Sequence, residues 1–232
     1  MTRRKAITTR LDIIQSAAKF FFKDGYSATS PRAIAEDLEI STGNLTYYFP
    51  TKEDLLAVFV EMLCNYQRVM MDIEAGEGVS SLLSVCLEQA IMAAMCEEDP
   101  AAKDFYLAAY TSPKCLEIIR RNDTARAKEV FREYCSGWDD VRFAEAETIV
   151  SGIEYATMMT TGDSAPLEKR IEAAVDNILT VYNVPAATRQ IKIAKTLSMD
   201  YRKVSRIVLK RFKKFIDETN EKALDELLSP KA

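Results

Sequence analysis

The chain has 232 residues, of which 48% are hydrophobic and 28% charged, the balance of a soluble globular protein rather than a disordered one. Its 7 glycines and 7 prolines are few for the tight turns of a β-sandwich or barrel, and its net charge is −4. It contains no histidine, which excludes Ser-His-Asp triads, Cys-His dyads and imidazole metal ligands, so we expect no enzyme, no metal site and no cofactor.

The first part of the chain predicts three helices. Residues 10–24 place apolar side chains on one face and are followed by Gly25, a residue typical of helix ends. Ser30 and Pro31 favour the start of a second, short helix. A third short helix is expected from Thr42 to about Phe49. The apolar face of the first helix consists of Ile14, Ala17, Ala18, Phe21 and Phe22.

Helical patterning continues through the rest of the chain. Thr51, with Asp54 three residues later, predicts the start of a long helix that runs to about Met70. The fold class that we predict is all-α, with three N-terminal helices followed by a larger helical part. The remaining helices are expected at about 79–97, 101–111, 113–135, 140–161, 166–182, 187–197 and 199–228.

Charge divides the chain into three parts. Residues 1–55 carry a net charge of +1, residues 56–185 one of −11, and residues 186–232 one of +6. We divide the chain accordingly at 1–55, 56–185 and 186–232, the last being a basic C-terminal helical extension. The acidic surplus of the middle part fits a solvated surface, although it would also tolerate a cationic ligand.

Two short helices joined by a three-residue turn have the spacing of a helix-turn-helix, in which the second helix enters the major groove of DNA. The same spacing also fits a small helical corner that only packs. The segment carries a dense set of signature residues: Ala17, Ala18, Phe21, Gly25, Tyr26, Thr29, Ser30, Ile34, Ala35 and the run from Ser41 to Leu55. Over residues 10–56 it resembles the DNA-binding domain of TetR-family transcriptional regulators. The resemblance implies an N-terminal three-helix helix-turn-helix DNA-binding domain over 1–55, followed by a larger helical effector domain over 56–185 for ligand binding and dimerisation. It also implies a homodimer that binds a double-stranded DNA operator and a small-molecule effector.

The resemblance also assigns DNA contacts to individual residues. Gly43 matches the position at which the backbone lies close to DNA, and the positions facing the groove or its edges are those of Thr42, Asn44, Thr46 and Tyr47. Thr46 departs from the commonest family pattern, which has tyrosine there. Because the predicted recognition helix has no Arg or Lys, it cannot make the commonest guanine contact, so base readout would rest on Asn44, which can pair with adenine.

Phosphate contacts are expected from residues around that helix. Tyr48 and Lys52 match positions that usually hold phosphates, and Arg32 matches one that reaches a phosphate or a base edge. Tyr48 departs from the family pattern, in which histidine is frequent. Most of the affinity would come from cations against phosphates, namely Arg3, Arg4, Lys5, Arg10, Arg32 and Lys52.

Adaptable and aromatic side chains concentrate in the middle of the chain and suggest a cavity between helices. Ordinary core packing is the alternative. The candidate ligand-binding residues are Met92, Met95, Tyr106, Tyr110, Tyr134, Trp138, Tyr155 and Met159.

Two apolar stripes predict the dimer interface, since the family architecture pairs two helices of each subunit in a four-helix bundle. An intrachain core is again the alternative. The stripes consist of Ile149, Ile153 and Ala156, and of Ile171, Val175, Ile178 and Tyr182.

The basic amphipathic segment 199–228 allows three interpretations. Its apolar stripe could pack on the effector domain with the cations solvated or facing the acidic middle, it could form a second helix-turn-helix, or it could bind an anionic membrane surface. We expect no membrane span, because the longest uncharged runs have 12 residues, whereas a span needs about 20. The five cysteines contain no CxxC pair and are expected as free, mostly buried thiols.

These features favour a cytoplasmic, dimeric, one-component regulator, most simply a repressor that a small molecule releases from a near-palindromic operator. The alternative is a helical protein-interaction or lipid- or small-molecule-binding protein without DNA readout.

Overall fold

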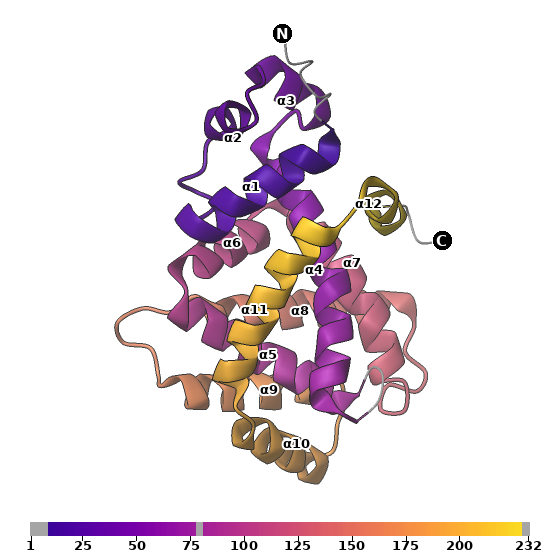
Figure 1. Cartoon of the computed structure of the whole chain (residues 1–232). Helices are drawn as coiled ribbons and strands as arrows, with labels where there is room; N and C mark the ends of the chain where they lie inside the picture. Colours follow the sequence, from indigo (N-terminus) through magenta and orange to yellow (C-terminus); the bar gives the residue numbers. More distant parts are fainter. Residues whose placement is uncertain (1–8, 78–80, 229–232) are drawn as a thin grey trace, which may run out of the picture.

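The N-terminal helices form a separate lobe at one end of the molecule, at the top of Figure 1. They are α1 (Arg10–Asp24), α2 (Pro31–Asp37) and α3 (Thr42–Tyr48). The computed structural model describes residues 9–77 and 81–228, and over these ranges it contains twelve α-helices and no strand. The all-α class and the three N-terminal helices predicted from the sequence are therefore confirmed.

A long helix, α4 (Lys52–Ala75), connects this lobe to the rest of the molecule. Thr51 and Asp54 form the predicted capping box at its start, each side chain accepting a hydrogen bond from the other residue's backbone N–H. The helix ends at Gly76, whose φ of 66° lies in the left-handed region that glycine adopts without strain. The predicted domain limit between residues 55 and 56 falls inside α4, so the two parts share one rigid element.

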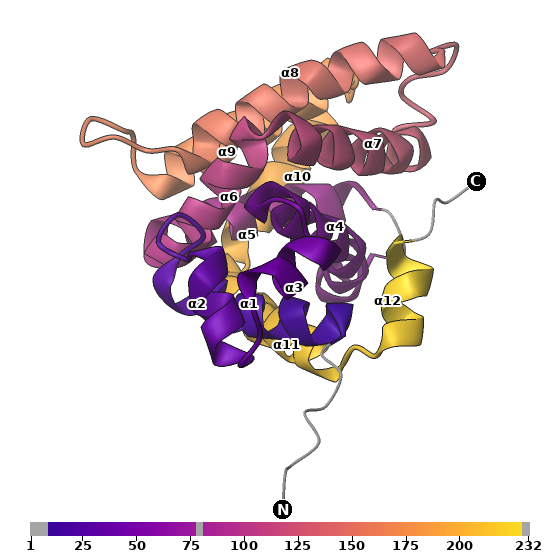
Figure 2. The same cartoon turned by 90° about the horizontal axis from the view of Figure 1, so that it is seen from above.

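The larger part of the molecule is built around α5 (Leu82–Glu98), which is buried on nearly all sides. Because its apolar residues face every direction, the helix has to be surrounded rather than lie on a surface. It contacts α4 and five further helices: α6 (Pro100–Thr111), α8 (Asp140–Met158), α9 (Leu167–Val181), α10 (Ala186–Ser198) and α11 (Tyr201–Glu218). The α7 helix (Pro113–Val130) packs between α4 and α8, and Figure 2 shows α8 along the outer edge of the molecule, opposite α11.

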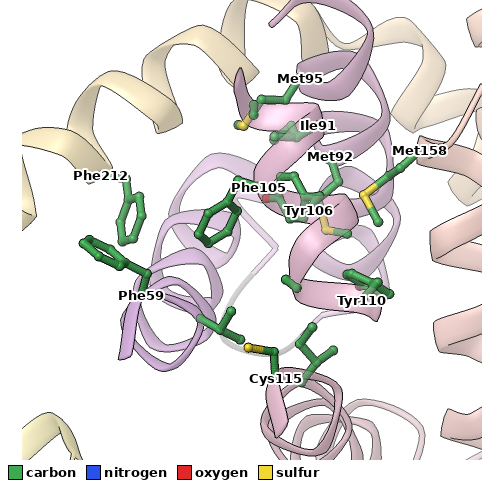
Figure 3. Close-up of a cluster of buried hydrophobic side chains, with 14 of the residues drawn as sticks. Phe59, Ile91, Met92, Met95, Phe105, Tyr106, Tyr110, Cys115, Met158 and Phe212 are labelled. Atoms are coloured by element: carbon green, nitrogen blue, oxygen red, sulfur yellow. The ribbon is translucent and has the colours of Figure 1, made fainter. Parts of the chain in front are cut away.

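One continuous hydrophobic core joins the two parts. It extends from Ile13 in α1 through Phe59 in α4 and Ile91 in α5 to Phe212 in α11, and Figure 3 shows the last three of these side chains in one buried cluster. The five cysteines are free and all but Cys64 are buried, as predicted. Within the described residues, no helix combines the length and apolar character needed to cross a membrane.

The C-terminal segment differs from the single helix predicted over 199–228. It forms α11 and then α12 (Glu221–Leu228), because Thr219 has an extended backbone with φ −64° and ψ 139°. The side chain of Asn220 then accepts a hydrogen bond from the Ala223 N–H at 3.0 Å and begins α12. No glycine or proline marks this break in the sequence.

The α11 helix packs on the core with its apolar stripe, which supports the first of the three interpretations of the basic segment. Phe212 is only 1% exposed and its ring lies 5.9 Å from that of Phe22 in α1. Arg202 and Arg206 form ion pairs with Glu98 at the end of α5, at 2.9 and 2.8 Å. The basic face thus neutralises acidic residues of the middle part of the chain.

Candidate nucleic-acid interface and ligand cavity

The α2–turn–α3 unit holds α3 on the lobe through one face only. In the turn, Glu39 has a φ of 53°, and the N–H of Ile40 donates back to the carbonyl of Ala35 at 2.9 Å. Leu45 in α3 and Phe49 just after it are each 3% exposed and fix the helix on the core. Everything on the opposite face of α3 points to solvent.

This outward face is polar and uncharged. Tyr47 is 81% exposed, which is unusual for a large aromatic side chain. Tyr48 is partly buried and its ring meets that of Tyr47 edge-on at 5.2 Å. The remaining exposed residues of α3 are Thr42, Gly43, Asn44 and Thr46. The structure therefore brings the predicted groove-facing residues together on one surface.

No close contact within the described residues requires glycine at position 43. A Cβ built there would meet only the Ser41 hydroxyl, at 3.7 Å, which is ordinary van der Waals contact. Glycine in a helix interior costs about 1 kcal/mol relative to alanine, and no close contact in the part of the chain that the structure describes requires glycine at this position.

The predicted phosphate-binding cations lie around α3, and each interacts with a different partner in the free protein. Arg32 is exposed and pairs with Glu36 at 2.8 Å. Lys52 lies 4.1 Å above the ring of Tyr26, and burial, the largest cause, lowers its pKa. Arg10 forms an ion pair with Asp225 of α12. The predicted arm residues Arg3, Arg4 and Lys5 lie outside the described residues.

A cavity of about 160 Å³ lies inside the larger part, between α4 and the helices α5 to α9. Three predicted ligand-binding residues line it: Met92, Tyr106 and Tyr110, and Figure 3 shows them together between α5 and α6. Met95 lines a separate space of about 20 Å³. The other four predicted residues line neither cavity: Tyr134, Trp138, Tyr155 and Met159.

Trp138 packs behind the cavity wall. Its ring lies 5.2 Å from that of Phe143 and 6.0 Å from that of Tyr182, a residue that does line the cavity.

The polar lining of the cavity escaped the sequence prediction. Glu147 and Glu154 of α8 are 3% and 8% exposed, whereas we expected the acidic surplus to be solvated. Glu154 accepts hydrogen bonds from the Gln89 amide and, at 2.8 Å, from the Tyr110 hydroxyl. Glu147 accepts one from the Tyr182 hydroxyl. Their spacing of seven residues places both on the same helix face as the buried Val150, and this was the signal available in the sequence.

Burial shifts the titration of these carboxyl groups. It is the largest cause raising the pKa of Glu147 to about 8, with the nearby Asp123 carboxylate as the second cause. For Glu154, burial and then the charge of Glu147 also raise the pKa to about 8. Both groups therefore change charge near neutral pH. No cluster of three or more metal-ligating side chains occurs in the parts of the chain that the structure covers.

The N-terminal segment matches a known family. Residues 13–58 match the profile described as "Bacterial regulatory proteins, tetR family". This segment is thus similar to the N-terminal segment of TetR-family regulators. The match covers most of α1, all of α2 and α3 and the start of α4, so the resemblance predicted from the sequence is confirmed.

Two curated relatives carry similar segments. The uncharacterized HTH-type transcriptional regulator YuxN of Bacillus subtilis (strain 168) is 48% identical over 44 residues, which are 19% of this chain and 15% of its own length. The HTH-type transcriptional regulator HbdR of Aromatoleum sp. (strain CIB) is 33% identical over 116 residues, 48% of each chain. The chain thus matches about half or less of the length of these relatives.

Among solved structures, the TetR regulator TylP of Streptomyces fradiae is 19% identical, with a TM-score of 0.49 over 90% of this chain and 99% of its own. Another is the TetR-family protein CprB of S. coelicolor A3(2), 23% identical with a TM-score of 0.45 over 82% and 96% of the two chains.

The interface predicted for a TetR-family dimer needs a correction at α9. Four predicted residues in or directly after α9 pack inside their own chain, each at most 2% exposed, because α9 packs against α5, α8 and α10: Ile171, Val175, Ile178 and Tyr182. On α8, by contrast, Ile149 is 56% exposed, Ala156 is exposed and Ile153 is partly buried. We therefore still predict the dimer interface on the outward face of α8.

Proposed function

We propose that the protein is a dimeric, TetR-type transcriptional regulator that binds an operator through α3 and is released when a small molecule fills the cavity. The observation that carries this proposal is the exposed, uncharged face of α3, which is held on the core only by its opposite side. A helix that packed for structural reasons alone would not leave Tyr47 81% exposed. The proposal includes a cytoplasmic location and no catalytic activity.

In the complex, α3 lies in the major groove with Gly43 closest to the DNA. Asn44 pairs with adenine, and Thr42, Thr46 and Tyr47 make methyl contacts and single hydrogen bonds to neighbouring bases. Phosphates bind Arg32, Tyr48 and Lys52 at the edges of the groove, where Arg32 exchanges its exposed ion pair with Glu36 for a phosphate.

Release is transmitted from the cavity walls to the DNA-binding lobe. The helices α6 and α7 line the cavity and also contact the lobe and the start of α4. Asp104 of α6 binds Ser27, and Lys114 and Ser112 at the start of α7 bind Asp54 and Glu53. A ligand that moves either helix therefore changes the position of α3, and a dimer with misplaced recognition helices no longer fits two half-sites.

The decisive experiment is an electrophoretic mobility shift with the DNA upstream of the chain's own gene, repeated over a salt series. We expect specific binding that weakens steeply as salt rises. Gly43→Ala should weaken binding at least tenfold and leave the melting temperature unchanged or raised, because the new methyl group fits the free protein.

Gln190→Ala, at an exposed position of α10 far from α3, is the control and should bind normally. A protein without DNA readout would show no shift with any variant, and equal binding by Gly43→Ala would remove α3 from the DNA contact.

A further inference from the structure

The cavity collects the unsatisfied polar groups of the protein. Three buried side-chain nitrogen or oxygen atoms in the described residues lack a hydrogen-bond partner: Gln67 Nε2, Arg126 Nε and Glu147 Oε2. All three belong to residues that line this one cavity. Buried polar atoms without partners are unfavourable, so their convergence at one space indicates a site that polar partners complete. The two nitrogens are donors that need acceptors, and Glu147 Oε2 is the atom that can accept from a ligand.

The lining contains more acidic than basic side chains. Two cations line the cavity, and both are already paired, Arg68 with Glu129 at 2.5 Å and Arg126 with Glu88. Three further acids line it for which the described residues provide no ion pair: Asp123, Glu147 and Glu154. A cationic ligand would therefore favour the ionised forms of these acids.

The rest of the lining determines the size and character of the ligand. Five aromatic side chains line the space: Phe105, Tyr106, Tyr110, Phe131 and Tyr182. The faces of aromatic rings stabilise cations. The ring edges and the neighbouring Met92 offer apolar contacts to the rest of a ligand. The cavity volume of about 160 Å³ is close to that of an engineered cavity of about 150 Å³ that holds benzene. A ligand with one ring, or an alkyl chain of similar bulk, fits.

We propose that the cavity binds an organic monoammonium ion with one ring or an equivalent alkyl group, its nitrogen between Glu147 and Glu154. The ammonium N–H groups donate to Glu147 Oε2, which has no partner in the ligand-free protein, and to the neighbouring carboxylate. The apolar body lies against Met92 and Tyr106.

Binding of such an ion is coupled to proton release. In the ligand-free protein, burial raises the pKa of both glutamates to about 8, so they are largely protonated at neutral pH. An ammonium ion favours their charged forms, and its affinity therefore rises as pH increases towards 8. The ionisable groups facing them are Cys64 from α4, Glu88 from α5, Tyr106 and Tyr110 from α6, Arg120, Asp123 and Arg126 from α7, and Tyr182 from α9.

The test is a calorimetric titration of the full-length, DNA-free protein with 2-phenylethylammonium at pH 6.5 and pH 8. This amine stays protonated over the range, because alkylammonium groups titrate near about 10.4. We expect binding at least fivefold tighter at pH 8, and at least tenfold weaker binding of the similarly shaped anion 3-phenylpropionate and of zwitterionic phenylalanine.

Two variants locate the site. Glu147→Gln should weaken 2-phenylethylammonium binding at least tenfold at pH 8 and reduce its pH dependence, and Glu154→Gln should do the same if the first variant melts early. Glu117→Gln, an exposed acid on the cavity-lining helix α7, is the matched control and should bind as the unmodified protein does.

Failure of 2-phenylethylammonium to bind, tighter binding of the anion or the zwitterion, or full binding by both glutamate variants would overturn the proposal. The role of this site in regulation rests on the proposed function. The titration contains no DNA and therefore tests ligand binding separately from operator binding. A protein that binds the amine and no operator would refute the proposed function alone, whereas an operator-binding protein that ignores the amine would refute only the ligand class.

Discussion

The carboxylate of Asp104 in α6 accepts two hydrogen bonds from Ser27, one from its backbone N–H at 2.6 Å and one from its hydroxyl at 2.5 Å. The same carboxylate lies so close to Gly25 that a Cβ there would be 2.8 Å from its Oδ2. A helix of the larger part therefore holds the backbone of the loop between α1 and α2 at Ser27. The same carboxylate leaves room only for glycine at position 25.

Removing this contact should loosen that loop locally. Asp104→Ala removes both acceptors of Ser27, so we expect amide hydrogen exchange at Ser27 to become about tenfold faster, equivalent to about 1.4 kcal/mol. Lys103→Ala, on the same helix but bonded to Thr160, is the control. An unchanged exchange rate at Ser27 in Asp104→Ala would show that the loop keeps its structure without this contact.

Asn44 and Lys52 should give different binding signatures. Asn44→Ala should cost about 1–3 kcal/mol of operator binding and relax the preference at one base pair. Lys52→Ala should weaken binding to all sequences alike and lower the salt slope by about one unit, because it removes a phosphate contact. Binding curves over several salt concentrations measure both. If both variants changed affinity, base preference and salt slope in the same way, the assignment of a base contact to Asn44 and a phosphate contact to Lys52 would be wrong.

Stability of the ligand-free protein should fall as pH rises. Glu147 and Glu154 have their pKa raised to about 8 by burial, against about 4.3 in an unfolded chain. Between these values the folded protein holds protons that the unfolded chain has released, so each group lowers the free energy of unfolding by at most about 1.4 kcal/mol per pH unit. Urea unfolding from pH 5 to pH 8 measures this slope.

Glu147→Gln should flatten that pH dependence and raise stability at pH 8, since a neutral amide replaces a buried carboxylate. The same slope in both proteins would show that Glu147 does not titrate in this range.

The C-terminal helix should be a structural element. Phe212 is 1% exposed and packs between Phe22 and Tyr66, so Phe212→Ala should cost about 3–5 kcal/mol. Arg206→Ala removes only an exposed ion pair and should cost less than about 1 kcal/mol. Thermal and denaturant unfolding compare the two. Deleting residues 199–232 should lower the melting temperature or cause aggregation, with operator affinity of the folded dimer changed less than tenfold.

Dimer formation should depend on the outward face of α8. Ile149→Asp places a charge at a position that is 56% exposed in the single chain and should yield a monomer in analytical ultracentrifugation. Ile191→Asp, at a position 67% exposed on α10, is the control and should remain dimeric. Dimers from both variants would move the interface away from α8.

The sequence predicts the N-terminal lobe well because its boundaries are set locally. The caps Ser30 and Thr51 and the break at Gly25 each act within a few residues, so no tertiary information is needed. The break after α11 has a local cap in Asn220 but no glycine or proline beside it, and it was missed.

The cavity and the α9 stripe depend on packing between distant segments. An apolar stripe such as that of Ile171 and Val175 looks the same in sequence whether it faces its own chain or a partner. Likewise, Glu147 could be read as solvated, because the helices that bury it lie far away along the chain.

The arrangement of Trp138 against Tyr182 gives the protein an optical reporter of its cavity. Trp138 is the single tryptophan of the chain, and the tyrosine beside it donates its hydroxyl hydrogen bond to Glu147. Ionisation of that carboxyl group, or a molecule placed against it, alters the local field at the indole and shifts its fluorescence emission. Occupancy of the cavity can thus be followed by light, without a label.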